Sequence, residues 1–181
     1  MDNSLEALNR AAEKLAVLAA ERSVRFVVAE SCTAGLVAST LGRVPGISQA
    51  LCGSAVTYRN DTKIEWLSVS TASIQRHTAV SDVVAVEMAR GVLAKTPEAS
   101  LAAAITGHLG PDAPQGMDGR AYIAIANRSP ERQSPGSLQT QVTECLLPSL
   151  GTDDAQAIRI FRQERAATMV IEALIQRMRD A

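Results

Sequence analysis

The chain has 181 residues, of which 46% are hydrophobic and 20% are charged, and its formal net charge at pH 7 is −1. This near-neutral charge, together with only 3% aromatic residues, excludes a protein that binds nucleic acid by general electrostatic attraction or by base stacking. No apolar run approaches the roughly 18 residues of a membrane span, and the acidic N-terminus is unlike a signal peptide. We therefore expect one soluble, cytoplasmic domain over residues 1–181 that contacts neither nucleic acid nor membrane.

Apolar periodicity and turn residues divide the chain into helices and strands. In chain order we expect a helix over 4–21, a strand over 25–29, a helix over 33–41, a strand over 51–58, helices over 60–67 and 81–95, strands over 101–106, 121–126 and 139–147, and a final helix over 153–179. Asn60 and Ser81 are the expected N-caps of their helices, and the polar residues 127–138 are expected to form a surface loop.

This order of elements predicts an α/β fold, a three-layer α/β/α sandwich around a mixed, mainly parallel sheet of about five strands. The strands over 121–126 and 139–147 have no helix between them, so we expect them to pair antiparallel. In an open α/β sheet, ligands bind beyond the carboxyl ends of the strands. The residues that follow the strands are therefore the first candidates for a functional site.

Ser31 lies where the expected strand over 25–29 turns directly into the next helix. Backbone N–H groups that open a helix lack partners, so such a corner can stabilise negative charge that develops on a ligand. Ser31 is thus the candidate nucleophile, with the amides near 33–35 as oxyanion donors. Helix capping by Ser31 or Thr33 is the structural alternative, and Cys32 at the same corner is an alternative nucleophile.

A serine hydroxyl needs a base to remove its proton, and a neutral lysine can be that base. Lys63 is expected in the first turn of the helix that begins at Asn60, where the helix dipole and burial both lower the pKa of its amine. A nearby Asp61 carboxylate would oppose this effect. Tyr58, at the end of the preceding strand, is expected to relay a proton or to orient Lys63. A solvated Lys63 and a structural Tyr58 remain alternatives.

Two further segments are candidates for substrate contact. A loop with Thr106, Gly107 and His108 follows the strand over 101–106, and its glycine lets the backbone approach a ligand closely. In the final helix, Arg162 or Arg165 is placed to reach a phosphate, with a solvated basic face as the alternative. The three cysteines and two histidines are scattered and form no metal-ligand motif.

These segments resemble the CinA C-terminal domain family, whose members include stand-alone nicotinamide-nucleotide amidases. Residues 29–35 read AESCTAG, similar to the family motif AESCTGG, and residues 53–63 are similar to G-x-x-x-T-Y-x-N-x-x-K. HTAVS at 77–81 and EMARG at 87–91 are similar to HGAVS and EMARG, and TGHLGP at 106–111 is similar to TGxAGP. The matches occur in the order of the family and cover roughly residues 5–180.

The resemblance implies hydrolysis of nicotinamide mononucleotide to nicotinate mononucleotide and ammonia, in pyridine-nucleotide salvage. By position, Ser31 matches the nucleophile, Lys63 the general base and Tyr58 its polar partner. From the resemblance and the residue patterns together, the expected substrate-binding residues are Glu30, Thr33, Ala34, Gly35, Thr106, Gly107, His108 and Arg162. The resemblance implies no metal or organic cofactor, a small-molecule nucleotide substrate, and self-association as a dimer or larger homo-oligomer.

Departures from the family pattern alter the expected pocket. Ala34 replaces the first glycine of the usual pair, and His108 and Leu109 replace a small, apolar pair. The loop over 112–119 lacks the usual double glycine. A bulkier pocket floor and an altered loop leave a second interpretation open, in which the chain binds a pyridine nucleotide without hydrolysing it and has a regulatory role.

Overall fold

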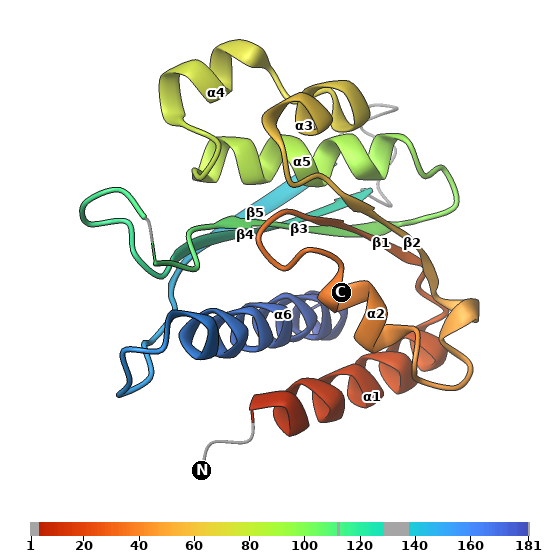
Figure 1. Ribbon diagram of the computed structural model, residues 1–181. Helices are drawn as coiled ribbons and strands as arrows, with labels where there is room; N and C mark the ends of the chain where they lie inside the picture. Colours follow the sequence, from red (N-terminus) through yellow and green to blue (C-terminus); the bar gives the residue numbers. More distant parts are fainter. Residues whose placement is uncertain (1–3, 112, 129–137, 181) are drawn as a thin grey trace.

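The computed structural model describes residues 4–111, 113–128 and 138–180, which form a five-stranded sheet with helices on both faces (Figure 1). The strands are β1 (Phe26–Glu30), β2 (Leu51–Val56), β3 (Leu101–Gly107), β4 (Arg120–Arg128) and β5 (Leu138–Leu146). The helices are α1 (Ser4–Arg22), α2 (Leu36–Leu41), α3 (Asn60–Leu67), α4 (Thr71–His77), α5 (Asp82–Ala94) and α6 (Ala155–Arg179), with a 3₁₀ turn at Ile47–Gln49.

The strand order across the sheet is β2-β1-β3-β4-β5. β1 pairs in parallel with β2 and β3, so that Glu30 lies opposite Val56 on one side and Ile105 on the other. The β3–β4 and β4–β5 pairs are antiparallel, which confirms the expected mixed sheet and the expected pairing of its last two strands. Because β1, β2 and β3 are neighbours with one direction, their carboxyl ends meet at the same edge of the sheet.

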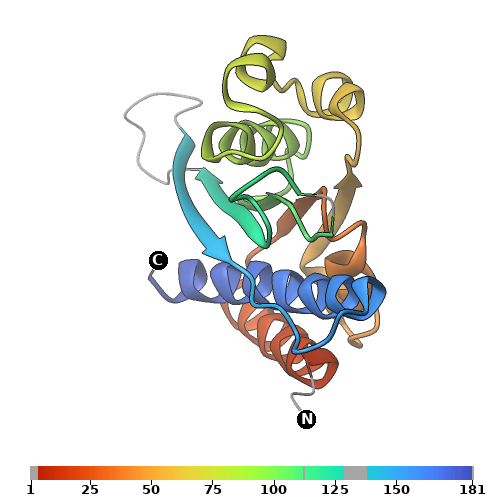
Figure 2. The ribbon, with the colours of Figure 1, turned by 60° about the vertical axis from the view of Figure 1, so that its left-hand side comes forward.

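Helices α1, α2 and α6 cover one face of the sheet, and α3, α4 and α5 lie over the other (Figures 1 and 2). On the first face, buried side chains such as Val28 and Ile105 belong to one apolar cluster with α1 and α6. On the second face, β3 presents small residues, including Ala102 and Ala104, to a cluster with α5. Alternation along each strand thus divides the core into two apolar layers.

Two helices differ from the sequence-based expectation. The sequence pattern does not predict α4, because none of its residues is buried and it therefore shows no apolar stripe. α2 begins at Leu36 rather than near Thr33, since Ala34 and Gly35 have left-handed φ angles of 53° and 95° that no α-helix contains. The corner after Ser31 is consequently a turn of the chain and not the first turn of the helix.

Of the two expected helix caps, Ser81 is confirmed and Asn60 is wrong. Arg59, and not Asn60, is the N-cap of α3, and its side chain makes no capping hydrogen bond. Ser81 caps α5 as expected, since its hydroxyl accepts a 3.3 Å hydrogen bond from the Val84 amide. Most of the surface loop expected at 127–138 lies outside the described residues. None of the described helices is long and apolar enough to cross a membrane.

Replacing Gly91 with alanine is expected to lower the free energy of unfolding by about 3 kcal/mol. A Cβ at this position in α5 would lie 1.9 Å from the Leu67 carbonyl oxygen at the end of α3, so the two helices would have to move apart. Urea unfolding measures the loss, and Gly151→Ala is the matched control because a Cβ there meets no atom within 4 Å. Equal stabilities of the two variants would contradict this packing.

Candidate active site

Ser31 and Lys63 meet where the carboxyl ends of β1 and β2 lie side by side. Ser31 directly follows β1, and Lys63 lies in the first turn of α3. The Lys63 amine donates a 3.0 Å hydrogen bond to the Ser31 hydroxyl and a 2.9 Å bond to the Thr57 carbonyl oxygen. Only 7% of Ser31 and 2% of Lys63 is exposed to solvent. The structure therefore brings together the two side chains that the sequence predicts as nucleophile and base.

Burial lowers the pKa of the Lys63 amine from 10.5 to about 8, because the charged form loses its hydration. The weaker, opposing influence comes from Cys32. The Asp61 carboxylate, which would raise the pKa of Lys63 if it lay close by, belongs to an exposed side chain. With a pKa of about 8, roughly one Lys63 side chain in ten is neutral at pH 7.

A pocket of about 560 Å³ lies in front of these two side chains, within the range of small-molecule binding sites. Its wall is built from the corners after β1 and β2, the segment before α5, the loop after β3 and the start of α6. Its polar side chains are Ser31, Tyr58, Asn60, Lys63, Thr106, His108 and Arg159. A ligand in this pocket would therefore contact the serine and the lysine at one end and other polar groups around them.

Tyr58 lines the pocket, but its recorded hydrogen bond is with Arg159 and not with Lys63, so a role of Tyr58 toward the lysine stays a prediction. The Tyr58 hydroxyl accepts a 2.6 Å hydrogen bond from Arg159 near the start of α6. The same guanidinium donates a 2.6 Å bond to the Gly110 carbonyl oxygen. The second hydrogen-bond partner of Lys63 is the backbone carbonyl oxygen of Thr57. Every residue has such a carbonyl, so the type of side chain at position 57 could not have predicted this bond.

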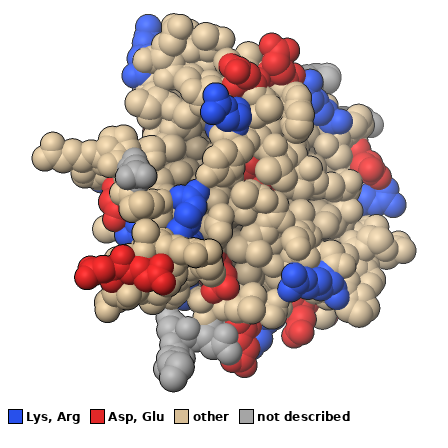
Figure 3. All heavy atoms as spheres, in the orientation of Figure 1, with Lys and Arg blue, Asp and Glu red and all other residues tan. Residues whose placement is uncertain are grey.

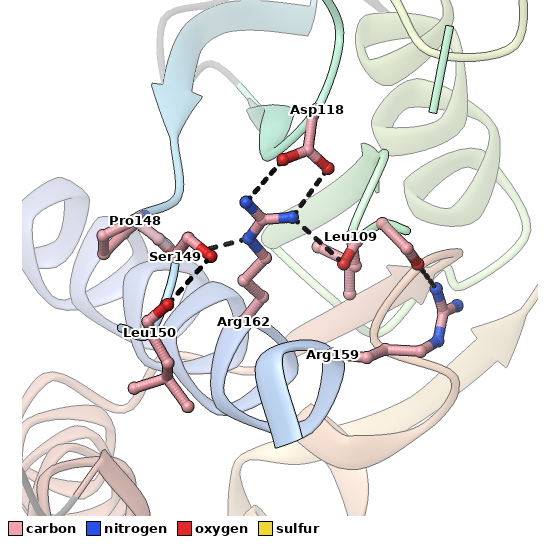
Figure 4. A network of polar contacts seen from close by, with 8 residues as sticks. Leu109, Asp118, Pro148, Ser149, Leu150, Arg159 and Arg162 are labelled. Carbon is pink, nitrogen blue, oxygen red and sulfur yellow. Dashed lines mark hydrogen bonds and ion pairs between the residues drawn. The ribbon is translucent and has the colours of Figure 1, made fainter. Parts of the chain in front are cut away.

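Arg162, expected at a phosphate, does not line the pocket and is only 3% exposed. Figure 4 shows its guanidinium between Asp118, Leu109 and Pro148. It donates to both Asp118 carboxylate oxygens, at 2.8 and 2.7 Å, and to the carbonyl oxygens of Leu109 and Pro148, at 3.3 and 3.2 Å. The hydrogen bonds from Arg162 lower the pKa of the Asp118 carboxyl. Arg162 therefore fixes the pocket loop to α6, and Arg159, three residues earlier, enters the pocket in its place.

Replacing Arg162 with methionine is expected to lower the free energy of unfolding by about 2 kcal/mol. The loss comes from unsatisfied carbonyl groups at Leu109 and Pro148, whereas the half-exposed Asp118 carboxylate regains water. Chemical denaturation measures the change against Arg179→Met, which removes an exposed arginine from the last turn of the same helix. An Arg162→Met variant as stable as this control would show that the network contributes nothing.

None of Glu30, Thr33, Ala34 and Gly35 is among the residues that line the pocket, so their contact with a substrate stays a prediction that the described lining does not support. The buried Glu30 carboxylate accepts hydrogen bonds from the Thr33 hydroxyl at 2.9 Å and the Gly35 amide at 3.0 Å. The Ala34 amide donates a 3.1 Å bond to the Ser31 carbonyl oxygen. Two of the three amides expected as oxyanion donors are thus already hydrogen-bonded within the protein.

The departures from the family pattern have different consequences in space. The methyl group of Ala34 is exposed and outside the pocket, so it does not make the pocket floor bulkier. Its left-handed φ of 53° gives a backbone reason for glycine at this position. Leu109, in contrast, lines the pocket and is buried. Of these departures, those at His108 and Leu109 in the loop after β3 are therefore the ones that line the pocket.

Thr106, Gly107 and His108 line the pocket, and their contact with a substrate stays a prediction. The Thr106 hydroxyl donates a 2.8 Å hydrogen bond to the Ala79 carbonyl oxygen and so ties β3 to the segment before α5. A Cβ at Gly107 would lie 2.7 Å from the Cβ of Ala121, so close packing against β4 requires the glycine. Burial lowers the pKa of the His108 imidazole, which favours its neutral form.

Cys32 also lines the pocket, but burial raises the pKa of its thiol to about 12. The thiolate is the nucleophilic form of cysteine, so Cys32 is a much weaker candidate nucleophile than Ser31. Within the described residues, no three His, Cys, Asp or Glu side chains form a group that could hold a metal ion.

Both signs of charge occur on one face of the molecule, whereas the charged side chains that line the pocket are positive. On the face shown in Figure 3, lysine and arginine side chains are interspersed with aspartate and glutamate. Among the described residues that line the pocket, in contrast, Lys63 and Arg159 are the charged side chains, and no carboxylate is present. The two positive side chains of the described lining therefore favour a ligand that carries negative charge.

A buried hydroxyl beside an amine of lowered pKa, in a pocket at the carboxyl edge of a sheet, is an arrangement that can support nucleophilic catalysis. Residues 8–145 match the model of the CinA C-terminal domain. A CinA-like protein of Chlorobaculum tepidum is 42% identical over 113 residues, which are 61% of this chain and 26% of that protein. The chain spans between a quarter and a third of the length of the curated relatives that it matches.

Two solved structures agree in fold over nearly the whole chain. The competence/damage inducible protein CihA from Agrobacterium tumefaciens has a TM-score of 0.78 at 27% identity, covering 94% of each chain. A CinA superfamily protein from Escherichia coli has a TM-score of 0.76 at 26% identity, covering 97% of this chain and 92% of that one. The protein thus belongs to the CinA C-terminal domain family.

Proposed function

We propose that this protein hydrolyses the carboxamide of nicotinamide mononucleotide to give nicotinate mononucleotide and ammonia. The observation that carries the proposal is the 3.0 Å contact between the Lys63 amine, whose pKa is lowered to about 8, and the buried Ser31 hydroxyl. The substrate follows from the resemblance to nucleotide amidases, and the positive pocket supports it because the substrate carries a phosphate.

In the first half of the reaction, neutral Lys63 acts as the base. Its N–H bond to the Thr57 carbonyl oxygen orients the amine so that its lone pair can accept the Ser31 proton. The Ser31 oxygen bonds to the carboxamide carbon, and the carbonyl oxygen gains the electron pair. The Cys32 amide, which directly follows the Ser31 residue on the pocket wall, is the proposed donor to this oxyanion.

In the second half, the intermediate collapses and the lysine returns its proton. The C–N bond breaks, the proton on Lys63 goes to the departing nitrogen, and ammonia leaves. Water then attacks the ester carbon with Lys63 again as base. The ester bond to Ser31 breaks, its hydroxyl is restored by the lysine proton, and the carboxylic acid product loses its remaining proton to water and leaves as a carboxylate.

Arg159 is the proposed contact for the phosphate, in place of Arg162. Its guanidinium lines the pocket and carries five N–H donors, of which two are recorded in bonds to Tyr58 and Gly110. The remaining donors match the geometry of phosphate oxygens. Tyr58 is then a residue that orients this arginine, rather than the lysine.

The direct test is to incubate the protein with nicotinamide mononucleotide and to measure ammonia and nicotinate mononucleotide. We expect both products in equal amounts, and a lower kcat/KM for nicotinamide riboside, which lacks the phosphate. Absence of ammonia release would contradict the proposal. Tight binding of the mononucleotide by calorimetry, without turnover, would instead support the regulatory alternative, for which the substituted pocket residues His108 and Leu109 provide the reason.

A further inference from the structure

Glu30 is the last residue of β1 and directly precedes the proposed nucleophile. Its side chain is fully buried, and its two carboxylate oxygens accept five hydrogen bonds. Oε2 accepts from the Thr33 hydroxyl, the Gly35 amide and the Val37 amide at 2.9, 3.0 and 3.1 Å, and Oε1 accepts from the Ala38 amide and the Ser54 hydroxyl, both at 3.0 Å.

The Glu30 carboxylate caps the N-terminus of α2, although Glu30 lies in β1 and is not the N-cap residue of that helix. The N-cap residue of α2 is Gly35, which has no side chain to accept a hydrogen bond. The first amides of a helix need an acceptor from outside the helix, and negative charge is favourable beside them. Glu30 provides both for Val37 and Ala38. The Glu30 carboxylate therefore already accepts from the Gly35 amide, which was expected from the sequence to bind a substrate oxyanion.

Glu30 also connects the two corners that carry the proposed catalytic side chains. Its backbone carbonyl accepts a 2.8 Å bond from the Thr57 amide, and the Thr57 carbonyl oxygen in turn accepts from Lys63. Its carboxylate reaches Ser54 on β2 and the turn that follows Ser31. One residue thus holds both sides of the 3.0 Å contact between Ser31 and Lys63.

We propose that Glu30 is the positioning residue of this site: its carboxylate holds the turn over 31–35 so that the Ser31 hydroxyl stays within reach of Lys63. Its catalytic consequence rests on the proposed amidase function, whereas its effect on the turn does not. Five donors converge on one carboxylate, which is an acceptor only. A glutamine of the same shape would place an NH₂ donor against either the Ala38 amide or the amides of Gly35 and Val37, so the turn could not keep its form.

The test uses Cys32 as a reporter, because it follows Ser31 in the same turn and the residue is only 5% exposed. Glu30→Gln is expected to raise the rate of Cys32 alkylation by N-ethylmaleimide at least tenfold, measured on the Cys32 peptide by mass spectrometry. It is also expected to lower kcat for nicotinamide mononucleotide at least tenfold with KM within threefold. The pH midpoint of kcat/KM should remain near 8, because Glu30 is not among the groups that shift the pKa of Lys63.

Two further variants separate positioning from general loss of stability. Leu93→Ala creates a cavity in the core on the α5 side, in the apolar cluster that does not contain Cys32, and destabilises the fold, so its Cys32 alkylation rate and kcat should match the wild type at 25 °C. Ser54→Ala removes one of the five donors and should give an intermediate increase in alkylation. If Glu30→Gln does not fold, Ser54→Ala and Thr33→Val, which removes a donor to the other oxygen, provide the test.

The outcomes distinguish this proposal from the proposed function. Wild-type alkylation and kcat in Glu30→Gln, or an equal increase in alkylation in Leu93→Ala, would overturn the positioning role. If the wild type releases no ammonia, the amidase proposal fails, and the alkylation rates alone still decide whether Glu30 holds the turn. Slow Cys32 alkylation in Ser54→Ala and Thr33→Val alike would also count against it.

Discussion

Replacing Ser31 with alanine is expected to reduce ammonia release from nicotinamide mononucleotide by about 10³-fold or more. The hydroxyl provides the atom that bonds to the carboxamide carbon, and Lys63, left without its 3.0 Å partner, has no proton to remove. Binding should change little, because the pocket wall remains. Steady-state kinetics with coupled ammonia detection, together with calorimetry of mononucleotide binding, measures both quantities.

Ser39→Ala is the matched control for this prediction. Ser39 is exposed on α2, close in sequence to the corner but outside the pocket lining, and its loss should leave kcat unchanged. Cys32→Ser should likewise retain activity, because a thiol with a pKa of about 12 contributes almost no thiolate at pH 7. An active Ser31→Ala variant combined with an inactive Cys32→Ser variant would transfer the nucleophilic role to Cys32.

Replacing Lys63 with methionine is expected to reduce kcat/KM by about 10³-fold at pH 8, since general-base catalysis typically contributes 10²–10⁴-fold. The wild type should show the complementary pH dependence. Protonated Lys63 has no lone pair, so kcat/KM should fall tenfold per pH unit below the pKa of about 8 and reach a plateau above it. A pH–rate profile of kcat/KM between pH 6 and 10 measures the midpoint in the free enzyme.

The Asp61→Asn variant tests whether the Asp61 carboxylate contributes to the midpoint of the pH–rate profile. Its carboxylate is exposed, and burial rather than Asp61 sets the pKa of Lys63, so the midpoint should stay near 8. A wild-type profile that is flat between pH 6 and 9 would show that Lys63 is not the base. A midpoint near 10.5 would show instead that its amine is hydrated in solution.

The contact between Ser31 and Lys63 is predictable from the sequence because strand direction determines it. Residues that follow neighbouring parallel strands must lie at the same edge of a sheet, and both residues follow such strands. The identity of the second partner of Lys63 is not predictable in this way. Any residue at position 57 offers a carbonyl oxygen, and only the path of the chain between β2 and α3 decides that Thr57 accepts the bond.

The choice between the arginines of α6 is also beyond the sequence. Arg159 and Arg162 are three residues apart, so they lie on nearly the same side of the helix. Which of them enters the pocket depends on Asp118, which a distant loop brings to Arg162 and which engages both ends of its guanidinium. The hydrogen bonds from α2 to Glu30 could not be predicted from the sequence for a related reason, since they depend on the left-handed turn at Ala34 and Gly35.

The pairing of Glu30 with Val56 and Ile105 has a consequence for how this site tolerates changes in chain length. Side chains alternate between the faces of a sheet, and those of β1 belong alternately to the two apolar clusters. Deleting one residue from β1 is therefore expected to change either the direction of Ser31 or the packing of the strand against its helices. A change of length is therefore expected to disturb the site most in β1 and in the turn over 31–35 that follows it.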